Sequence, residues 1–469
     1  MTPNKHWFWI LIIFIYCFSP TKPIKTPHKL FKKISKVVLK VIKPFPRIPI
    51  LDRLERLKNL QDPDYGLGIG ELILSRGYQV ESHYITTQSG YILHLFRIIH
   101  PKLKSYQLKK PILLWHGVIG SGIQFLINSP GGNYDEPEQK FAGNNLGFEL
   151  AKHGYDVWLM NARGNYYSKN HTFLDPDKDY KRYWNFSLDE LVSEDAPLAI
   201  DYILEKTNRR KIGWIGWSHG SAVGLCALAQ HPRLNEIIEP YIGLAPVLAF
   251  GGGTYPNLLW HMHWVWGPRY KLHGDGNYLP DALFPPLGLD IFCVVEPTWC
   301  SIILDSLTGG ETNYNKSRIF LYLDMGTMAL SEKLWRGWTQ QFQTGKTVKK
   351  FDYGKEGNMK MYGSYEAPTY PLQNITSRSI YFFWCDLDGE VGPTDVNTLR
   401  NTLKTPFTEF HMTDHKWGHA DFAWGRQSGM LINTPIIQIL DSIDKYGESV
   451  LPEKWTHFEL GNDTVKPFY

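Results

Sequence analysis

Residues 211–232, with the sequence KIGWIGWSHGSAVGLCALAQHP, join an apolar run of strand length to a sharp turn and then to an apolar helical segment. The strand is predicted over 212–215, and Pro232 ends the helix. Ser218 stands at the centre of the turn 216–220, a G-x-S-x-G pattern between a strand and a helix. The glycines let strand and helix approach closely, and the turn exposes the serine oxygen at the positive end of the helix. This stretch predicts a nucleophile elbow with Ser218 as the nucleophile.

Upstream of the elbow, strand and helix patterns alternate. From Gly70 a short helix and two alternating strands around the turn 88–90 predict an antiparallel hairpin at a sheet edge. The next predicted elements are the buried strands 111–115 and 155–160 and the helical segments 146–153 and 181–204. This order predicts an α/β fold with a mostly parallel, doubly wound sheet, in which ligands bind at the carboxyl ends of the strands.

Downstream, the strand pattern 241–247 is followed by a long region without the strand-helix rhythm. Residues 248–370 are rich in Gly, Trp, Pro and His, and we interpret them as a cap or lid insertion, with a structural appendage as the alternative. Its segment 251–275 carries several Trp and His residues. Strand patterns return at 379–384 and 407–412. The strand-helix core is therefore predicted in two parts, 51–247 and 371–469.

The amino-terminal region predicts entry into the secretory pathway. Residues 7–18 form an uninterrupted apolar run of signal-peptide length, so 1–19 is predicted as a signal peptide, with an uncleaved signal anchor as the alternative. Residues 20–50 are a basic amphipathic pro-segment or linker, which favours peripheral contact with a membrane surface or, equally, removal as a disordered segment. Five sequons agree with secretion and predict N-glycosylation at Asn170, Asn185, Asn315, Asn374 and Asn462.

Composition and cysteine usage narrow the function classes. Lys and Arg total 50 and Asp and Glu 46, so the net charge of +4 gives no basis for nucleic-acid binding. Cys293 and Cys300 are close enough in sequence for a small-loop disulfide, whereas Cys226 and Cys385 are predicted to be buried free thiols. The cysteine spacing does not suggest zinc, and we predict neither a metal nor a cofactor.

A nucleophilic serine needs a base and an acid that orients the base. Two ionisable pairs follow the returning strands: Asp386 or Asp388 after the first, and His415 or His419 after the second. Gly389 permits the chain to reverse directly after Asp388, which favours Asp388 as the acid. The strand 111–115 ends in His-Gly-Val, where the amide of Val118 is placed to stabilise an oxyanion.

Several stretches resemble the acid lipase family, the α/β-hydrolases that include gastric and lysosomal acid lipases. The matching motifs are GYILHLFRI (90–98), WHGV (115–118), NARGNYYS (161–168), YWNFSLDE (183–190), GWSHG (216–220), LAPV (244–247), NYNKSR (313–318), PTDV (393–396) and HADFAWG (419–425). The resemblance implies Ser218 as nucleophile, Asp388 as acid and His419 as base. It also implies that the backbone amides of Val118 and His219 form the oxyanion hole.

The chain departs from the family pattern at three places. The residue after the serine is His219 where the family usually has Gln, residues 324–329 read DMGTMA where it has PAGTS, and Trp338 lacks the usual preceding His. Substrate preference is therefore the family property that these departures affect most. The resemblance implies a secreted or lysosomal lipase that hydrolyses triacylglycerols or steryl esters at a lipid–water interface. The alternatives are a small-ester esterase or acyltransferase, and a catalytically idle lipid-binding protein on the same scaffold.

Overall fold

A computed structural model describes residues 62–137, 139–248, 293–294, 297–309, 313–325, 329–344, 347–413, 417–447 and 457–460. The predicted segments 1–19 and 20–50, the Trp- and His-containing segment 251–275, His415 and the sequon at Asn462 lie outside the described residues. Within the described part of the chain, no helix is both long and apolar enough to cross a membrane.

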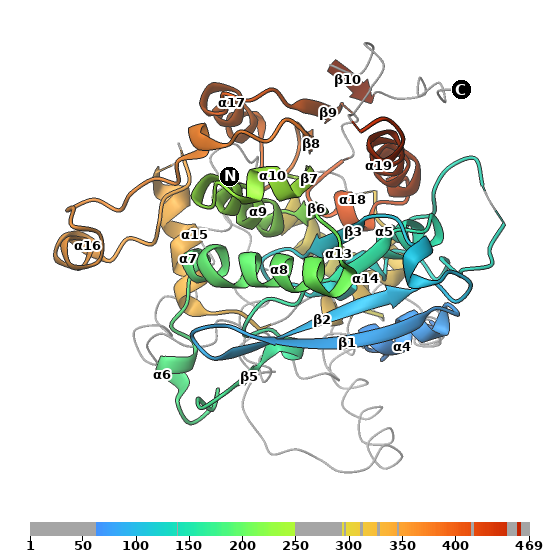
Figure 1. The fold of residues 1–469 in the computed structure, drawn as a ribbon, viewed down its shortest axis with the longest axis horizontal. Coiled ribbons are helices and arrows are strands. Elements are labelled where there is room, and N and C mark those ends of the chain that lie inside the picture. Colours follow the sequence, from blue (N-terminus) through green and yellow to red (C-terminus); the bar gives the residue numbers. More distant parts are fainter. Residues whose placement is uncertain are drawn as a thin grey trace, which may run out of the picture.

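One sheet of ten strands organises the molecule (Figure 1). Its strands are β1 (Gln79–Thr86), β2 (Tyr91–Ile99), β3 (Pro111–Trp115), β4 (Asp156–Leu159), β5 (Asn170–His171), β6 (Ile212–Trp217), β7 (Ile238–Leu244), β8 (Ile380–Cys385), β9 (Thr408–Met412) and β10 (His457–Leu460). They lie in the order β1-β2-β4-β3-β6-β7-β8-β9-β10, and β5 pairs with β2. The hairpin β1-β2 is antiparallel, as is its junction with β4, and every pair from β4 to β10 is parallel.

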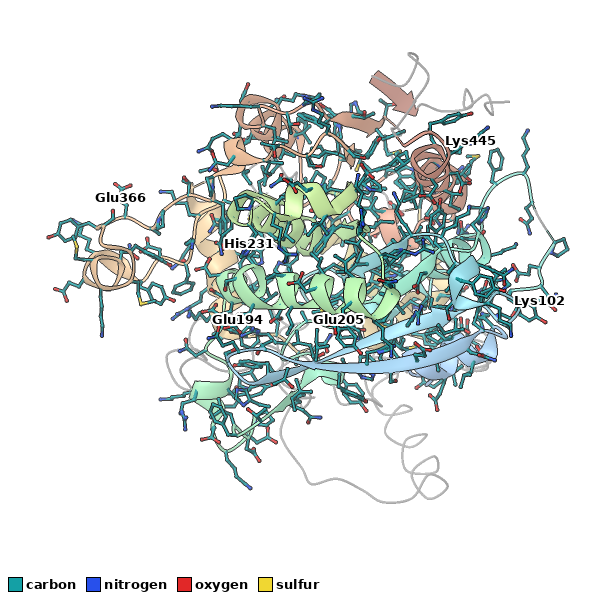
Figure 2. All side chains as sticks on the ribbon, viewed as in Figure 1. Lys102, Glu194, Glu205, His231, Glu366 and Lys445 are labelled. Carbon is teal, nitrogen blue, oxygen red and sulfur yellow. A yellow bond between two sulfur atoms is a disulfide. The ribbon has the colours of Figure 1, made fainter. Side chains whose placement is uncertain are left out.

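Helices surround this sheet. They are α4 (Ile69–Ser75), α5 (Leu146–Lys152), α6 (Tyr180–Tyr183), α7 (Leu188–Glu190), α8 (Ala196–Thr207), α9 (His219–Gln230), α10 (Leu234–Ile237), α13 (Pro297–Thr308), α14 (Ile319–Asp324), α15 (Glu332–Thr344), α16 (Gly354–Tyr362), α17 (Pro393–Thr402), α18 (Asp421–Trp424) and α19 (Thr434–Tyr446). Helices α8, α9 and α10 lie together in Figure 1. Figure 2 shows Glu366 on the segment that extends outward beside α16.

The predicted strand-helix order is confirmed. The hairpin, the buried strands and the helix after Ser218 lie where the sequence patterns predict them, and the sheet is mostly parallel. Strand β6 is buried over its whole length because it lies at the centre of the sheet between β3 and β7. Trp115 on β3 stacks on Trp214 of β6 with ring centroids 5.0 Å apart. Full burial of such side chains stabilises the fold by roughly 2 to 3 kcal/mol each.

In its described part, the chain between β7 and β8 forms helices α13 to α16. The described residues between β7 and β8 add no strand to the sheet, which agrees with the loss of the strand-helix rhythm in 248–370. Arg318, before α14, forms ion pairs with Asp62 (2.8 Å) and Asp64 (2.6 Å) near the start of the described chain. These ion pairs connect the chain before α14 to the segment before α4.

Candidate active site

Ser218 has the backbone of a strained turn between β6 and α9. Its φ of 54° and ψ of −118° lie outside the regions that residues other than glycine prefer. The turn is held by the Ser218 amide, which donates to the Leu244 carbonyl at 2.8 Å, and by the Ser218 carbonyl, which accepts from Ser221 N–H at 2.9 Å. The residue is 3% exposed. The conformation places Ser218 at the carboxyl end of β6, as the elbow predicts.

The two glycines of the elbow are required by close approach. A Cβ on Gly216 would lie 2.3 Å from the Gly220 carbonyl oxygen, and a Cβ on Gly220 would lie 2.2 Å from the Trp115 carbonyl oxygen. Real Cβ atoms do not come this close to backbone, so any side chain would separate α9 from the sheet. The G-x-S-x-G pattern is therefore a packing requirement of this turn.

The structure separates the two candidate acids. Asp388 Oδ2 lies 2.8 Å from His419 Nδ1, and both side chains are buried. The other oxygen, Asp388 Oδ1, accepts the backbone N–H groups of Glu390 and Val391, each at 2.8 Å. By contrast, Asp386 is 43% exposed and lies 3.0 Å from His411 Nε2. Asp388 is therefore the carboxylate that contacts the predicted base.

Trp217 connects the elbow to His419. Its indole Nε1–H donates to the His419 carbonyl at 3.2 Å, and the Trp217 and His419 rings lie 5.7 Å apart between centroids. Because Trp217 immediately precedes Ser218, this contact places the His419 loop beside the nucleophile turn. The structure thus brings the three sequence-predicted residues, from the ends of β6, β8 and β9, to one edge of the sheet.

Glu390 is a further acidic residue at the site, which the sequence reasoning missed. Its Oε2 lies 3.3 Å from His419 Nε2, so the imidazole lies between two carboxylates. Burial lowers the pKa of His419, but the charges of Asp388 and Glu390 outweigh this effect and raise its pKa to about 9. For the Glu390 carboxyl, burial acts in the opposite direction and raises the pKa to about 7. The sequence feature that could have identified Glu390 is its position two residues after Asp388.

The amides of Val118 and His219 are available to a ligand. Neither N–H donates a hydrogen bond to the described residues, and both residues line a small cavity beside the elbow. The His219 amide begins α9, where the first N–H groups of a helix lack intrahelical acceptors. Two unused backbone donors next to a nucleophile turn can stabilise the negative oxygen of a tetrahedral intermediate.

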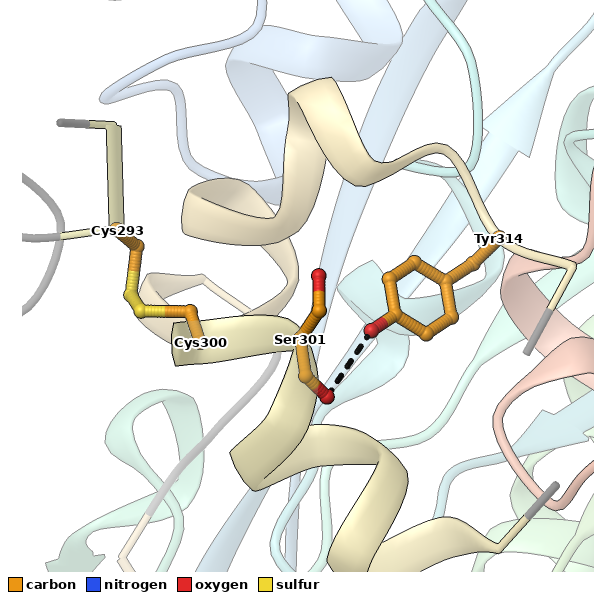
Figure 3. Close-up of a disulfide and its surroundings, with 4 residues drawn as sticks. All are labelled: Cys293, Cys300, Ser301 and Tyr314. Carbon is orange, nitrogen blue, oxygen red and sulfur yellow. Dashed lines mark hydrogen bonds between the residues drawn. A yellow bond between two sulfur atoms is a disulfide. The ribbon is translucent and has the colours of Figure 1, made fainter. Parts of the chain in front are cut away.

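Helix α13 contacts the loops that carry Asp388 and His419. Its last residue, Thr308, accepts the backbone N–H of Gly389 at 2.8 Å and that of His419 at 2.9 Å through one carbonyl oxygen. The start of α13 is secured by the disulfide Cys293–Cys300, with an S–S distance of 2.01 Å, and by Tyr314, whose hydroxyl donates to the Ser301 carbonyl (Figure 3). The chain between β7 and β8 therefore contributes backbone contacts to the site.

The remaining sequence-predicted positions are two cysteines and four sequons. Cys226 and Cys385 are free and buried, which confirms that prediction, and burial raises the pKa of both thiols well above the usual range. Among the described sequons, the asparagine is exposed at Asn170, Asn185 and Asn374 and half-buried at Asn315.

Comparisons with known proteins agree with this geometry. Two family models match: "Partial alpha/beta-hydrolase lipase region" over residues 69–129 and "alpha/beta hydrolase fold" over residues 110–247. Gastric triacylglycerol lipase of Bos taurus is 29% identical over 394 residues, covering 82% of this chain and 93% of the relative. Lipase member M of Mus musculus is 30% identical over 390 residues, covering 81% and 87%. Lysosomal acid lipase/cholesteryl ester hydrolase of Macaca fascicularis is 29% identical over 396 residues, covering 81% and 92%.

The fold and the matched models define an α/β-hydrolase, an enzyme that acts on carboxylic esters. The chain belongs to the acid lipase family, together with the gastric and lysosomal acid lipases. The family resemblance read from the motifs is therefore confirmed, and the protein is a lipase.

Proposed function

We propose that this lipase hydrolyses the ester bonds of neutral lipids through an acyl-enzyme on Ser218, with His419 as general base and Asp388 as the acid that orients it. The observation that carries the proposal is the buried 2.8 Å contact between Asp388 Oδ2 and His419 Nδ1, held beside the strained Ser218 turn by Trp217. A carboxylate on Nδ1 fixes the tautomer in which the neutral ring accepts a proton at Nε2, the nitrogen that also lies 3.3 Å from Glu390 Oε2.

The reaction follows from these positions. Ser218 Oγ attacks the ester carbonyl while its proton passes to His419 Nε2, and the resulting oxyanion accepts hydrogen bonds from the amides of Val118 and His219. Collapse of this intermediate breaks the bond to the alcohol, which leaves with the proton from His419. Water then attacks the acyl-enzyme with His419 again as base, which releases the fatty acid and regenerates Ser218. These steps require only side chains and backbone of the chain.

The substrate class rests on the relatives. One is named as a triacylglycerol lipase and another as a cholesteryl ester hydrolase, so we propose triacylglycerols or steryl esters at a lipid–water interface as substrates. The cap, 248–370, then covers the site and admits lipid from the interface. The same relatives support a secreted or lysosomal location, reached through a signal peptide at 1–19 and accompanied by glycans on the exposed sequons.

The test is a comparison of monomeric and emulsified substrates of increasing acyl length. The proposal predicts that the rate rises when the substrate passes from monomer to emulsion, and that long-chain triacylglycerol or steryl ester is cleaved. A small-ester esterase would show no rise at the interface, and an acyltransferase would transfer the acyl group to an added alcohol in preference to water. Lipid binding without turnover would instead support the idle lipid-binding protein.

A further inference from the structure

The polar side chains around the cavity beside the elbow are almost all engaged by neighbouring protein groups. His116 uses both ring nitrogens, Nδ1 with the Gly117 carbonyl at 2.7 Å and Nε2 with the Ala162 amide at 3.1 Å. Arg163 is paired with Asp195 and Glu194. The Asn165 side chain accepts the amides of Tyr167 and Ser168 and donates to the Asn161 side chain.

His219 is different, because one of its ring nitrogens has no partner among the described residues. The residue is 2% exposed and lines the same cavity as Val118. Its Nδ1 lies 3.2 Å from Nε1 of Trp338 on α15, whereas Nε2 is buried without a hydrogen-bond partner in the described part of the structure. A buried polar atom without a protein partner either hydrogen-bonds a ligand or a water molecule, or lowers the stability of the fold.

The contact with Trp338 determines whether Nε2 of His219 is a hydrogen-bond donor or an acceptor. An indole N–H only donates, so His219 Nδ1 must be the acceptor and the ring proton must be on Nε2. Burial, assisted by nearby His116, lowers the pKa of His219 to about 3, so the ring is neutral over the physiological range. His219 therefore presents a fixed, uncharged Nε2–H donor, and a cap helix sets its tautomer.

We propose that the Nε2–H of His219 is a substrate-binding donor that hydrogen-bonds an oxygen of the ester, in addition to the two backbone amides; this rests on the proposed function. An ester offers acceptors and no donors, which is the complement of an unused N–H. The other cavity walls include the apolar side chains of Leu191, Leu330 and Leu334. Ser218 directly precedes His219 at the start of α9.

The experiment compares three variants with the wild-type enzyme on p-nitrophenyl butyrate. His219→Phe keeps a ring and removes the donor, and His219→Gln keeps a side-chain N–H donor. Trp338→Phe keeps His219 and removes the hydrogen bond that fixes its ring tautomer. We expect kcat/KM to fall about 10-fold to 100-fold in His219→Phe, less than about 5-fold in His219→Gln, and to an intermediate extent in Trp338→Phe. Equal kcat/KM in His219→Phe and the wild type would overturn the proposal, as would equal losses in His219→Phe and His219→Gln.

A direct observation keeps the test decisive if His219→Phe does not fold. In ¹⁵N-histidine-labelled wild-type enzyme, the proton of His219 should be on Nε2, and its resonance should move downfield when Ser218 is phosphonylated by p-nitrophenyl hexylphosphonate. A ring proton on Nδ1 of His219, or an Nε2–H resonance that does not change when Ser218 is phosphonylated, contradicts the proposal. Failure of the proposed function gives a different result, because the wild-type enzyme would then neither hydrolyse esters nor take up the phosphonate on Ser218.

Discussion

Replacing Asp388 by Asn is predicted to abolish most of the activity without disturbing the fold. In the wild-type structure, Asp388 Oδ1 accepts two backbone N–H groups at 2.8 Å, from Glu390 and Val391, while Oδ2 faces His419 Nδ1 at 2.8 Å. An asparagine has one oxygen and one NH₂ group. Since two backbone donors require the oxygen, the NH₂ group is expected to face His419.

This orientation reverses the tautomer of the base. An NH₂ group opposite Nδ1 requires Nδ1 to accept, so the ring proton moves to Nε2, which can then no longer take the proton of Ser218. Loss of the correct tautomer in a serine triad lowers kcat by about 10⁴-fold, or about 5.5 kcal/mol of transition-state stabilisation. We therefore expect a decrease of about three to four orders of magnitude in Asp388→Asn.

The matched control is Asp386→Asn, because Asp386 is two residues away, is 43% exposed and faces His411. It should cost about tenfold or less. The assay is kcat on a soluble p-nitrophenyl ester, with circular dichroism and thermal unfolding to show that both variants are folded. The reverse ranking of the two variants, or a loss below about 100-fold in a folded Asp388→Asn enzyme, would refute the acid assignment.

Two further predictions concern residues around His419. Glu390→Gln removes one of the charges that raise the pKa of His419 to about 9. Because His419 must be neutral to act as the base, the acidic limb of the pH profile of kcat/KM should move to lower pH by about one unit. An unmoved limb would exclude an effect of Glu390 on the pKa of His419. Gly309→Ala places a Cβ 2.2 Å from Gly389 N at a φ of +76°, whereas Gly354→Ala has the same φ and no atom within 4 Å. Chemical denaturation should show a loss of about 1 kcal/mol in Gly354→Ala and clearly more in Gly309→Ala, which should also lose activity; equal losses would mean that the end of α13 does not hold the acid loop.

The sequence predicted those features that local patterns determine. The elbow could be predicted because Gly216 and Gly220 are needed wherever a strand, a tight turn and a helix pack this closely. The hairpin and the buried strands were readable from their alternation and apolar runs. The choice between Asp386 and Asp388 was supported by the turn that Gly389 permits, and the structure places Asp388 against His419.

The remaining features depend on contacts between distant segments, which no local pattern encodes. Thr308 of α13 contacts the loops of Gly389 and His419, and Trp338 contacts His219 across more than a hundred residues. Glu390 reaches His419 Nε2 only because the turn after Asp388 folds back over the imidazole. Neither the second carboxylate at His419 nor the tautomer of His219 can be inferred until these elements are assembled.

The most direct test of serine catalysis in this lipase is to locate the residue that a phosphonate inhibitor modifies. The enzyme is treated with p-nitrophenyl hexylphosphonate, its remaining ester hydrolysis is measured, and the labelled peptide is sequenced by mass spectrometry, with Ser218→Ala as the control. We predict one phosphonate per chain on Ser218, loss of hydrolysis in proportion to labelling, and neither labelling nor more than residual hydrolysis in folded Ser218→Ala. Hydrolysis at the wild-type rate in Ser218→Ala, or inactivation by label on another residue, would contradict Ser218 as the nucleophile.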